Sequence, residues 1–371
     1  MSGEENTSPA GPVAKSEILE IPQYVQGKSA LPGNDSAIKL SSNESSFGPS
    51  PKAIEAYKDM AAHLHRYPDG SQYELREAIA DAYSLDANKI ICGNGSDEIL
   101  DMVYRSYLGR DDEVILSTNH FVMCSLYARM QAAKIRFAKE NSFKTDVEDL
   151  LSLVNDKTRM VTIANPNNPT GTYLTSEEIR QIHAGLPSNV LFVIDGAYAE
   201  YPVEDDYDCG SKLVEEFDNV IVTRTFSKIY GLAALRIGWA YCPDSVIDVL
   251  QRIRSPFNTT SPSMAAAVAA VKDPQHIEKV RQHTAAWLKK IRTALEELGI
   301  EVVPSASNFY LLNFKNCEGK TSAEAASYLE NNGVIPRPQG PAGDEDILRI
   351  TVGLDEENEA VLKILKAYMS E

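Results

Sequence analysis

Two cations, Lys228 and Arg236, interrupt an otherwise largely apolar stretch, "TFSKIYGLAALRIGW", which runs from Thr225 to Trp239. Burying either charge is costly unless an opposite charge or a hydrogen-bonding partner accompanies it. A lysine amine held away from water can lose its proton and then attacks aldehydes. An arginine keeps its proton, so a buried Arg236 requires an anion such as a carboxylate or a phosphate. An internal ion-pair network would explain one of these cations easily and both poorly.

Polar residues that could bind a ligand follow three other apolar runs. Gly95 lies in "CGNGSDE", a tight loop that opens a helix and could bind an anion, although such loops are more often structural. Asn168 lies in the rigid turn "NPNNPTG", which an ordinary Asn-Pro turn also explains. Asp195 ends the run "VLFVID", and Tyr198 follows three residues later. A carboxylate in an apolar pocket suits a protonated ring nitrogen, although buried aspartates also cap helices.

These clusters can act together only if their strands end at a common edge. Short runs rich in Val and Ile alternate with longer amphipathic stretches, which predicts an α/β fold with buried, largely parallel strands. Ligands in such open sheets bind beyond the carboxyl ends of the strands, where all four clusters fall. After about Pro262 the sequence becomes helix-rich, with the strand-like runs "FYLLNF" and "ILRITVG", which is typical of a smaller α+β domain.

The chain has 371 residues, more than a single domain usually holds, and we expect four parts. The polar start lacks the apolar core of a signal peptide, which indicates a flexible tail. The predicted parts are a tail over residues 1–17, an N-terminal arm joining the small domain over 18–50, a large cofactor-binding domain over 51–261 and a small C-terminal domain over 262–371.

The four clusters together match the groups of one cofactor. They supply a nucleophilic lysine, an aspartate for a pyridinium nitrogen, an Asn/Tyr pair for a phenolic oxygen, and an arginine with an amide-rich helix end for a phosphate. Pyridoxal 5'-phosphate requires a Schiff-base lysine, an acidic partner for its ring nitrogen and a phosphate site. We therefore expect the chain to bind pyridoxal phosphate.

The composition excludes several other classes of protein. A formal net charge of −17 argues against nucleic acid or an anionic membrane as the main partner. No stretch approaches the ~20 apolar residues of a membrane span. The five cysteines are scattered, odd in number and form no C-x-x-C, which argues against structural disulfides and fits the cytoplasm. His63 and His65 have no third ligand in view, so we interpret them as surface residues and expect no metal.

The ordered set "NNPTG", "DGAY" and "TFSK", with an arginine eight residues after the lysine (236 − 228 = 8), resembles the aspartate-aminotransferase-like enzymes of fold type I. The stretches "IPQYVQGKS", "LSSNESSFGPSPKA", "HRYPDGS", "GNGSDE" and "LRITVG" narrow the resemblance to the histidinol-phosphate aminotransferase family, from about Ile21 to the end. This resemblance implies a large domain with a mostly parallel seven-stranded sheet between helices, a smaller α+β domain, and a homodimer with shared active sites.

The same resemblance implies a role for each matching residue. Lys228, Asp195 and Tyr198 would be catalytic: Lys228 would bond to the cofactor and transfer the proton, and Asp195 would keep the ring nitrogen protonated. Asn168 would join Tyr198 at the ring oxygen. The other cofactor contacts would come from Gly95, Ser96, Asp97, Thr225, Ser227 and Arg236 at the phosphate, from Phe121 on the ring face, and from Tyr67, which would reach the cofactor of the neighbouring subunit.

The substrate side also follows from the resemblance. In most relatives the arginine of "LRI", here Arg349, binds a substrate carboxylate. In this family Arg349, helped by Arg337, would bind the phosphate of L-histidinol phosphate and then the carboxylate of glutamate, since an arginine fork fits both anions. Tyr24 and Asn43 would lie beside the substrate. The implied reaction is transamination with 2-oxoglutarate, giving imidazole-acetol phosphate and L-glutamate.

Three departures from the family pattern concern the substrate pocket. The stretch "PQGPAGDEDILR" lacks the family's tyrosine-glycine pair, Cys124 stands where a tyrosine is expected, and "ESSFGP" replaces "ENPFGP". They leave the identity of the amino donor open, with an aromatic amino-acid aminotransferase, for phenylalanine or tyrosine, as the nearest alternative. A decarboxylase of phosphorylated amino acids is a second alternative. A catalytically silent protein on the same fold is a further alternative, against which the intact Lys228, Asp195 and Arg236 argue.

Overall fold

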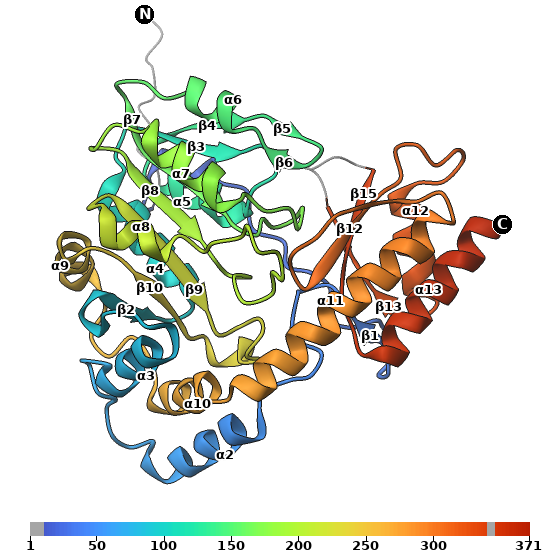
Figure 1. Cartoon of the computed structure of the whole chain (residues 1–371), viewed down its shortest axis with the longest axis horizontal. Coiled ribbons are helices and arrows are strands. Elements are labelled where there is room, and N and C mark those ends of the chain that lie inside the picture. Colours follow the sequence, from blue (N-terminus) through green and yellow to red (C-terminus); the bar gives the residue numbers. More distant parts are fainter. Residues whose placement is uncertain (1–10, 340–345) are drawn as a thin grey trace, which may run out of the picture.

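A seven-stranded sheet forms the larger part of the molecule (Figure 1). The computed structural model describes residues 11–339 and 346–371. Every neighbouring pair in the sheet is parallel except those that β10 makes with β2 and β9. The expected mostly parallel seven-stranded sheet is confirmed. Its spatial order is β2 (Ile90–Gly93), β10 (Gly238–Tyr241), β9 (Val220–Thr225), β8 (Leu191–Asp195), β7 (Thr158–Ala164), β3 (Glu113–Ser117) and β4 (Lys134–Ala138).

Helices cover both faces of this sheet, which explains why most of its strands are apolar throughout. One face packs against α4 (Ser96–Tyr107), α5 (Val122–Met130) and α9 (Asp244–Ile253). The other packs against a larger set of helices: α3 (Tyr73–Tyr83), α6 (Val147–Ser152), α7 (Ser176–Ala184), α8 (Ser211–Glu216) and α10 (Ser261–Val271), with α2 (Pro51–Asp59) outside α10.

The second part of the molecule is a smaller α+β unit, as predicted. Its antiparallel sheet has the order β11 (Glu301–Val303), β12 (Phe309–Asn313), β15 (Ile347–Thr351) and β14 (Arg337–Pro338). It packs on α11 (Pro274–Glu296), α12 (Ser322–Asn331) and α13 (Asp355–Ser370) in a separate apolar core. Helix α11 runs from one part to the other in Figure 1, since Val280 belongs to the large core and Trp287 to the small one.

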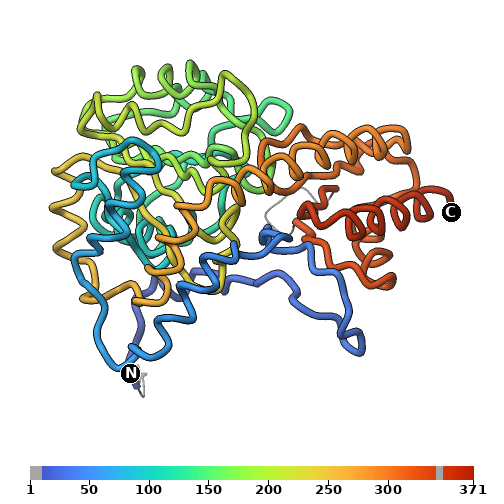
Figure 2. The backbone as a smooth tube through the Cα atoms, turned by 60° about the horizontal axis from the view of Figure 1, so that its bottom comes forward, coloured from blue at the N-terminus to red at the C-terminus, as the bar shows by residue number. Residues whose placement is uncertain are grey.

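The N-terminal arm joins both parts (Figure 2). In α1 (Ser16–Leu19), Glu17 forms an ion pair with Arg110 of the large part at 3.2 Å, and β1 (Ile38–Lys39) pairs in parallel with β13 (Val334–Ile335) of the small part. Residues 1–10 of the predicted tail lie outside the described residues. The predicted domain limits stay a prediction; α10, which they assign to the small domain, packs into the large core.

The remaining elements are short. They are the 3-10 turns η1 (Met60–His63), η2 (Ala87–Lys89) and η3 (Ala233–Leu235) and the two-residue strands β5 (Glu140–Asn141) and β6 (Lys144–Thr145). Within residues 11–339 and 346–371, no helix is long and apolar enough to cross a membrane, and no group of three potential metal ligands is found. All five cysteines have free thiols.

Candidate active site

The polar clusters predicted from the sequence lie at the ends of neighbouring strands. Asp195 is the last residue of β8 and Thr225 the last residue of β9. Gly238 of β10 pairs with both Thr225 and Gly93, the last residue of β2, and α4 begins three residues later at Ser96. Four adjacent strands therefore bring these side chains to one edge of the sheet, as the α/β pattern predicted.

Asp195 is a buried carboxylate held by the Thr223 hydroxyl and the backbone of Ala197. It is 5% exposed, and Thr223 Oγ1 donates to its Oδ1 at 3.0 Å. Burial, together with the charge of Asp97, raises the pKa of Asp195 to about 6, although the Thr223 bond and the Lys228 charge lower it. A protonated nitrogen beside this carboxylate would supply the charge that the pocket lacks, so Asp195 fits the ring-nitrogen role.

Lys228 lies near Asp195, three residues beyond the end of β9. Its Nζ donates to the carbonyl of Ser42 at 3.2 Å and lies 5.6 Å from the ring centroid of Tyr198. Tyr198 is buried, and its hydroxyl accepts from Asn43 Nδ2 at 2.9 Å. The structure thus places Lys228, Tyr198 and Asn43 together, beside Asp195.

The loop before α4 forms a cradle beneath Arg236. Gly95 has φ +79°, a conformation that favours glycine, and a Cβ there would lie 2.5 Å from Arg236 Nη2, so a side chain would displace the guanidinium from its present position. Arg236 Nη2 donates to Asp97 Oδ2 at 3.3 Å, and Nη1 donates to Ser227 Oγ at 3.2 Å. Thr225 Oγ1 in turn donates to Ser227 Oγ at 3.0 Å.

This cradle has the donor set of a phosphate site. A helix N-terminus, a guanidinium and two hydroxyls meet there, and all favour an anion. The other carboxylate oxygen of Asp97, Oδ1, is buried without a hydrogen-bond partner among the described residues. The residues present therefore fit pyridoxal phosphate at both ends, with Asp195 and Lys228 toward the ring and the Arg236 cradle toward the phosphate.

The expectation that Arg236 is buried was wrong. Its side chain is 45% exposed, and it adopts φ +46° between η3 and β10. Ile237, the residue after Arg236, is fully buried, and the strand begins only at Gly238. The apolar residues just before Arg236 belong to a loop, which turns the Arg236 guanidinium outward. There Asp97 pairs with it.

Two arginines lie opposite each other on adjacent strands of the small sheet. Arg337 of β14 and Arg349 of β15 are direct cross-strand partners, an arrangement in which like charges repel. Arg349 is 8% exposed; its guanidinium donates to the Ser41 carbonyl at 3.0 Å and to Asn168 Oδ1, while its Nε has no partner among the described residues. Burial lowers the pKa of Arg349 to about 10. An anion between the two arginines would relieve both penalties.

Other predicted residues occupy less defined positions. The guanidinium of Arg337 donates to the Val25 carbonyl at 3.0 Å, next to the partly exposed Tyr24. Phe121 precedes α5 and packs against the core under α4 and α5. Tyr67 is 82% exposed and stacks on Phe257 with ring centroids 4.7 Å apart. No described contact brings Phe121 or Tyr67 to Asp195 or Lys228, so their roles stay predictions.

Sequence reasoning missed two residues that hold the site. Thr223 bonds Asp195, and its position two residues before Thr225 could have revealed it, because alternate residues of a strand share a face. Ser42 bonds Lys228 through its backbone carbonyl, which leaves no trace in side-chain types.

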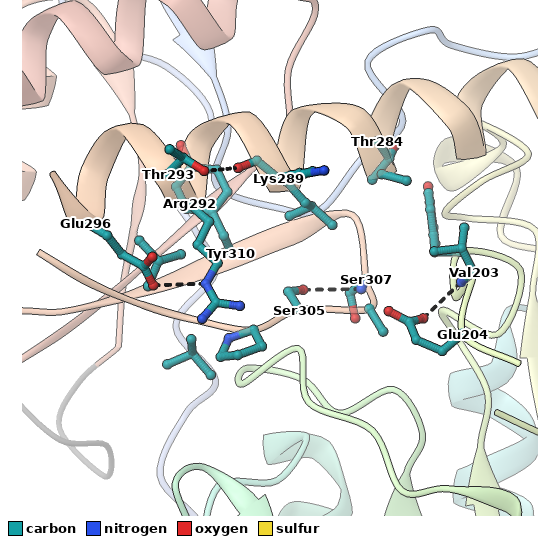
Figure 3. Close-up of a pocket in the computed structure, with 17 residues that line it drawn as sticks. Val203, Glu204, Thr284, Lys289, Arg292, Thr293, Glu296, Ser305, Ser307 and Tyr310 are labelled. Atoms are coloured by element: carbon teal, nitrogen blue, oxygen red, sulfur yellow. Dashed lines mark hydrogen bonds and ion pairs between the residues drawn. The ribbon is translucent and has the colours of Figure 1, made fainter. Parts of the chain in front are cut away.

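A separate cavity of about 460 Å³ lies beside helix α11 (Figure 3). It is bounded by α11, the turn before β12 and the loop after β8, and Tyr310 and Ser307 line it with buried hydroxyls that have no partner among the described residues. None of the predicted site residues lines it. It is therefore distinct from the candidate site around Lys228.

Comparison with known proteins agrees with this geometry. Residues 35–365 match the model of the family "Aminotransferase class I and II". The chain therefore belongs to the class I and II aminotransferases. Within that family it is 46% identical to histidinol-phosphate aminotransferases from Rhodopseudomonas palustris (strain BisB5) and Paramagnetospirillum magneticum, over 97% and 96% of this chain and 99% of each relative.

A solved structure shows the same similarity. The chain is 26% identical to the histidinol-phosphate aminotransferase from Sinorhizobium meliloti, whose crystal structure is a complex with pyridoxal-5'-phosphate. The TM-score is 0.88, and the match covers 98% of this chain and 99% of that one. The predicted fold type and family are confirmed.

Proposed function

We propose that this protein is a pyridoxal-phosphate-dependent aminotransferase that converts L-histidinol phosphate and 2-oxoglutarate into imidazole-acetol phosphate and L-glutamate, a step of histidine biosynthesis. The observation that carries the substrate is the cross-strand pair of Arg337 and Arg349 beside Asn43 and Tyr198. Two adjacent guanidinium groups suit a dianionic phosphate better than a single carboxylate. The relatives at 46% identity carry the same activity in their names.

The cofactor would be held by the residues whose geometry fits it. Lys228 would bond to its aldehyde carbon, Asp195 would pair with its ring nitrogen, and Arg236 with Ser227 would bind its phosphate. When bound, pyridoxal phosphate supplies an aldehyde that bonds to amines and a ring that withdraws electrons from the substrate carbon. Asn168 and Tyr198 remain the proposed partners of its ring oxygen.

The chain's own residues then supply the proton transfer and the orientation. With the cofactor bound, the amine of Lys228 would act as a general base that accepts the proton of the substrate carbon, and then as a general acid that gives this proton back. Asp195, kept dry by the core, favours a protonated ring nitrogen throughout. Arg337 and Arg349 hold the substrate phosphate in the first half-reaction and a carboxylate of glutamate in the second, with Tyr24 and Asn43 alongside.

The assembly and compartment are part of the same proposal. Tyr67 is almost fully exposed on this chain, as a residue that reaches into a neighbouring subunit would be, and we propose a homodimer with shared active sites. We also propose a cytoplasmic enzyme, which the five free thiols favour.

Replacement of the lysine tests the proposed chemistry. Lys228→Ala should abolish nearly all transamination of L-histidinol phosphate and the covalent attachment of the cofactor, which absorbance and borohydride trapping would measure. A variant that kept near-normal turnover would refute the assignment. If the unaltered protein released carbon dioxide from a phosphorylated amino acid, without any need for 2-oxoglutarate, it would instead be a decarboxylase.

A further inference from the structure

A buried polar cluster lies on the face of the large sheet opposite to the candidate site. It consists of Glu200, Arg224, Tyr83 and Tyr230, and we name it the back-face cluster. Glu200 Oε1 accepts from Arg224 Nη2 at 2.8 Å and from the Tyr83 hydroxyl at 3.1 Å, and the Tyr83 hydroxyl also bonds to that of Tyr230. The side chains of Arg224 and Glu200 are 4% and 6% exposed.

The geometry of β9 explains why this cluster lies behind the site. Arg224 stands between Thr223, which bonds Asp195, and Thr225, which bonds Ser227. Successive side chains of a strand point to opposite faces, so Arg224 points away from the site while its two neighbours point into it. The same short segment of β9 thus supports the site on one face and the back-face cluster on the other.

Two other members of the cluster also lie close to site residues along the chain. Glu200 follows Tyr198 by two positions, and Tyr230 follows Lys228 by two positions. Glu200 therefore fixes the loop after β8, and Tyr230 fixes the turn after β9. Tyr83, at the end of α3, bonds to both of them and joins the two segments.

The stability of the fold does not explain this ion pair. Arg224 Nε and Glu200 Oε2 are buried without hydrogen-bond partners among the described residues, so part of the cost of burial is not recovered. Well-packed apolar residues often replace such a pair with no loss of stability. The pair does fix the orientation of the side chains around it, because the Arg224 guanidinium also lies 4.8 Å from the Tyr83 ring centroid and 5.4 Å from the Trp239 ring centroid.

We propose that Glu200 and Arg224 are positioning residues, which act through Tyr83 and Tyr230 to hold Tyr198 and Lys228 in register with Asp195. This inference rests on the proposed function, since it concerns the same reaction. The two residues touch neither the reacting atoms nor the cradle at Arg236. Their effect is to keep two loops at a fixed distance from each other and from the strand that carries Thr223 and Thr225.

The test replaces the pair by apolar residues of similar size, in the double variant Glu200→Leu, Arg224→Met. We expect unfolding at a temperature near that of the wild type, a KM within a few-fold, and a kcat lowered by about 10- to 100-fold, since a displacement of about 1 Å can cost ~10²-fold. Without cofactor, amide exchange over residues 196–201 and 226–231 should become faster, and the affinity for pyridoxal phosphate should fall.

A matched control removes another ion pair of the same sheet. Glu113 is the first residue of β3, at the amino end of the strands, and pairs with Arg136 of β4. The variant Glu113→Gln, Arg136→Met should keep the kcat and the cofactor affinity of the wild type. Wild-type protein that fails to turn over L-histidinol phosphate refutes the proposed function itself and not the positioning role.

Two results would overturn the positioning role. The first is a folded double variant with an unchanged kcat and unchanged cofactor affinity. A second variant, Tyr83→Phe, provides a test if the double variant does not fold. It removes only the hydroxyl that joins Glu200 and Tyr230, and it should lower kcat several-fold without lowering the unfolding temperature by more than a few degrees. An unchanged kcat in Tyr83→Phe would then contradict the proposal.

Discussion

At the scale of single residues, Asp195 and Arg349 are two buried charged side chains whose surroundings offset the cost of burial only in part. Burial raises the pKa of Asp195 to about 6 and lowers the pKa of Arg349 to about 10, which in both cases disfavours the charged form. A protonated ring nitrogen of the cofactor at Asp195 and an anion of the substrate at Arg349 would offset the two penalties. The cost of burying these two side chains fits residues that bind charged groups of a ligand.

The cost of Asp195 leads to a prediction about stability. Its folded pKa of about 6 lies above the ordinary value of 3.8, so between about pH 4 and pH 6 the folded state holds a proton that the unfolded chain has released. The free energy of unfolding should therefore fall as the pH rises through this window. Asp195→Asn, without cofactor, should be more stable than the wild type at pH 7.5 by at most roughly 3 kcal/mol, at about 1.4 kcal/mol per pKa unit.

Urea unfolding of both cofactor-free proteins at pH 4 and pH 7.5 measures this difference. The advantage of Asp195→Asn should nearly disappear at pH 4, where the wild-type carboxyl is largely protonated in the folded state and about half protonated in the unfolded chain. The same pH dependence in the two proteins would show that Asp195 is not the buried carboxyl described. With cofactor, the order should reverse, because the neutral amide of the Asp195→Asn variant cannot offer a negative charge to a protonated ring nitrogen.

At the scale of elements, strand pairing brings together the residues of the proposed substrate site. The short strand β14 brings Arg337 opposite Arg349 of β15, and the N-terminal arm contributes the Ser41 carbonyl and Asn43 beside them. Three segments far apart in the chain thus form the proposed anion site. The cofactor side, by contrast, comes from the consecutive strands β8, β9 and β10 and from α4.

The arginine pair provides a prediction at this scale. Arg349→Met removes a buried, poorly compensated cation, so the unfolding temperature should stay the same or rise, while KM for L-histidinol phosphate should rise about 10- to 100-fold, the worth of a lost charged hydrogen bond. Arg337→Gln should raise KM in the same direction. Steady-state kinetics with each variant measure both effects, and an unaltered KM in Arg349→Met would place the substrate phosphate elsewhere.

The sequence predicted the elements of the cofactor side better than those of the substrate side. Asp195 and Thr225 end continuous apolar runs, so the strand ends and their common edge followed from the pattern. The exposure of Arg236 did not, because a loop can carry the same apolar letters as a strand. Contacts that depend on register or on distant packing, such as Tyr83 with Glu200 at a separation of 117 residues, have no signature in a single sequence.

At the scale of the whole molecule, the site lies where the larger and smaller parts meet. Helix α11 spans both cores, the N-terminal arm runs along both, and the site draws Lys228 and Asp195 from one part and Arg349 from the other (Figure 1). In the proposed function, substrate binding therefore bridges the two parts. The identity of the substrate depends on how they meet, and the departures at Cys124 and in the stretch before Arg349 leave an aromatic amino acid as the competing amino donor.

A steady-state comparison of two amino donors tests this account most directly. With 2-oxoglutarate as the acceptor, kcat/KM would be measured for L-histidinol phosphate and for L-phenylalanine under the same conditions. The paired arginines predict a much higher kcat/KM for L-histidinol phosphate, because only this donor brings a phosphate to them. A higher kcat/KM for phenylalanine would contradict the proposed function and identify an aromatic amino-acid aminotransferase on the same scaffold.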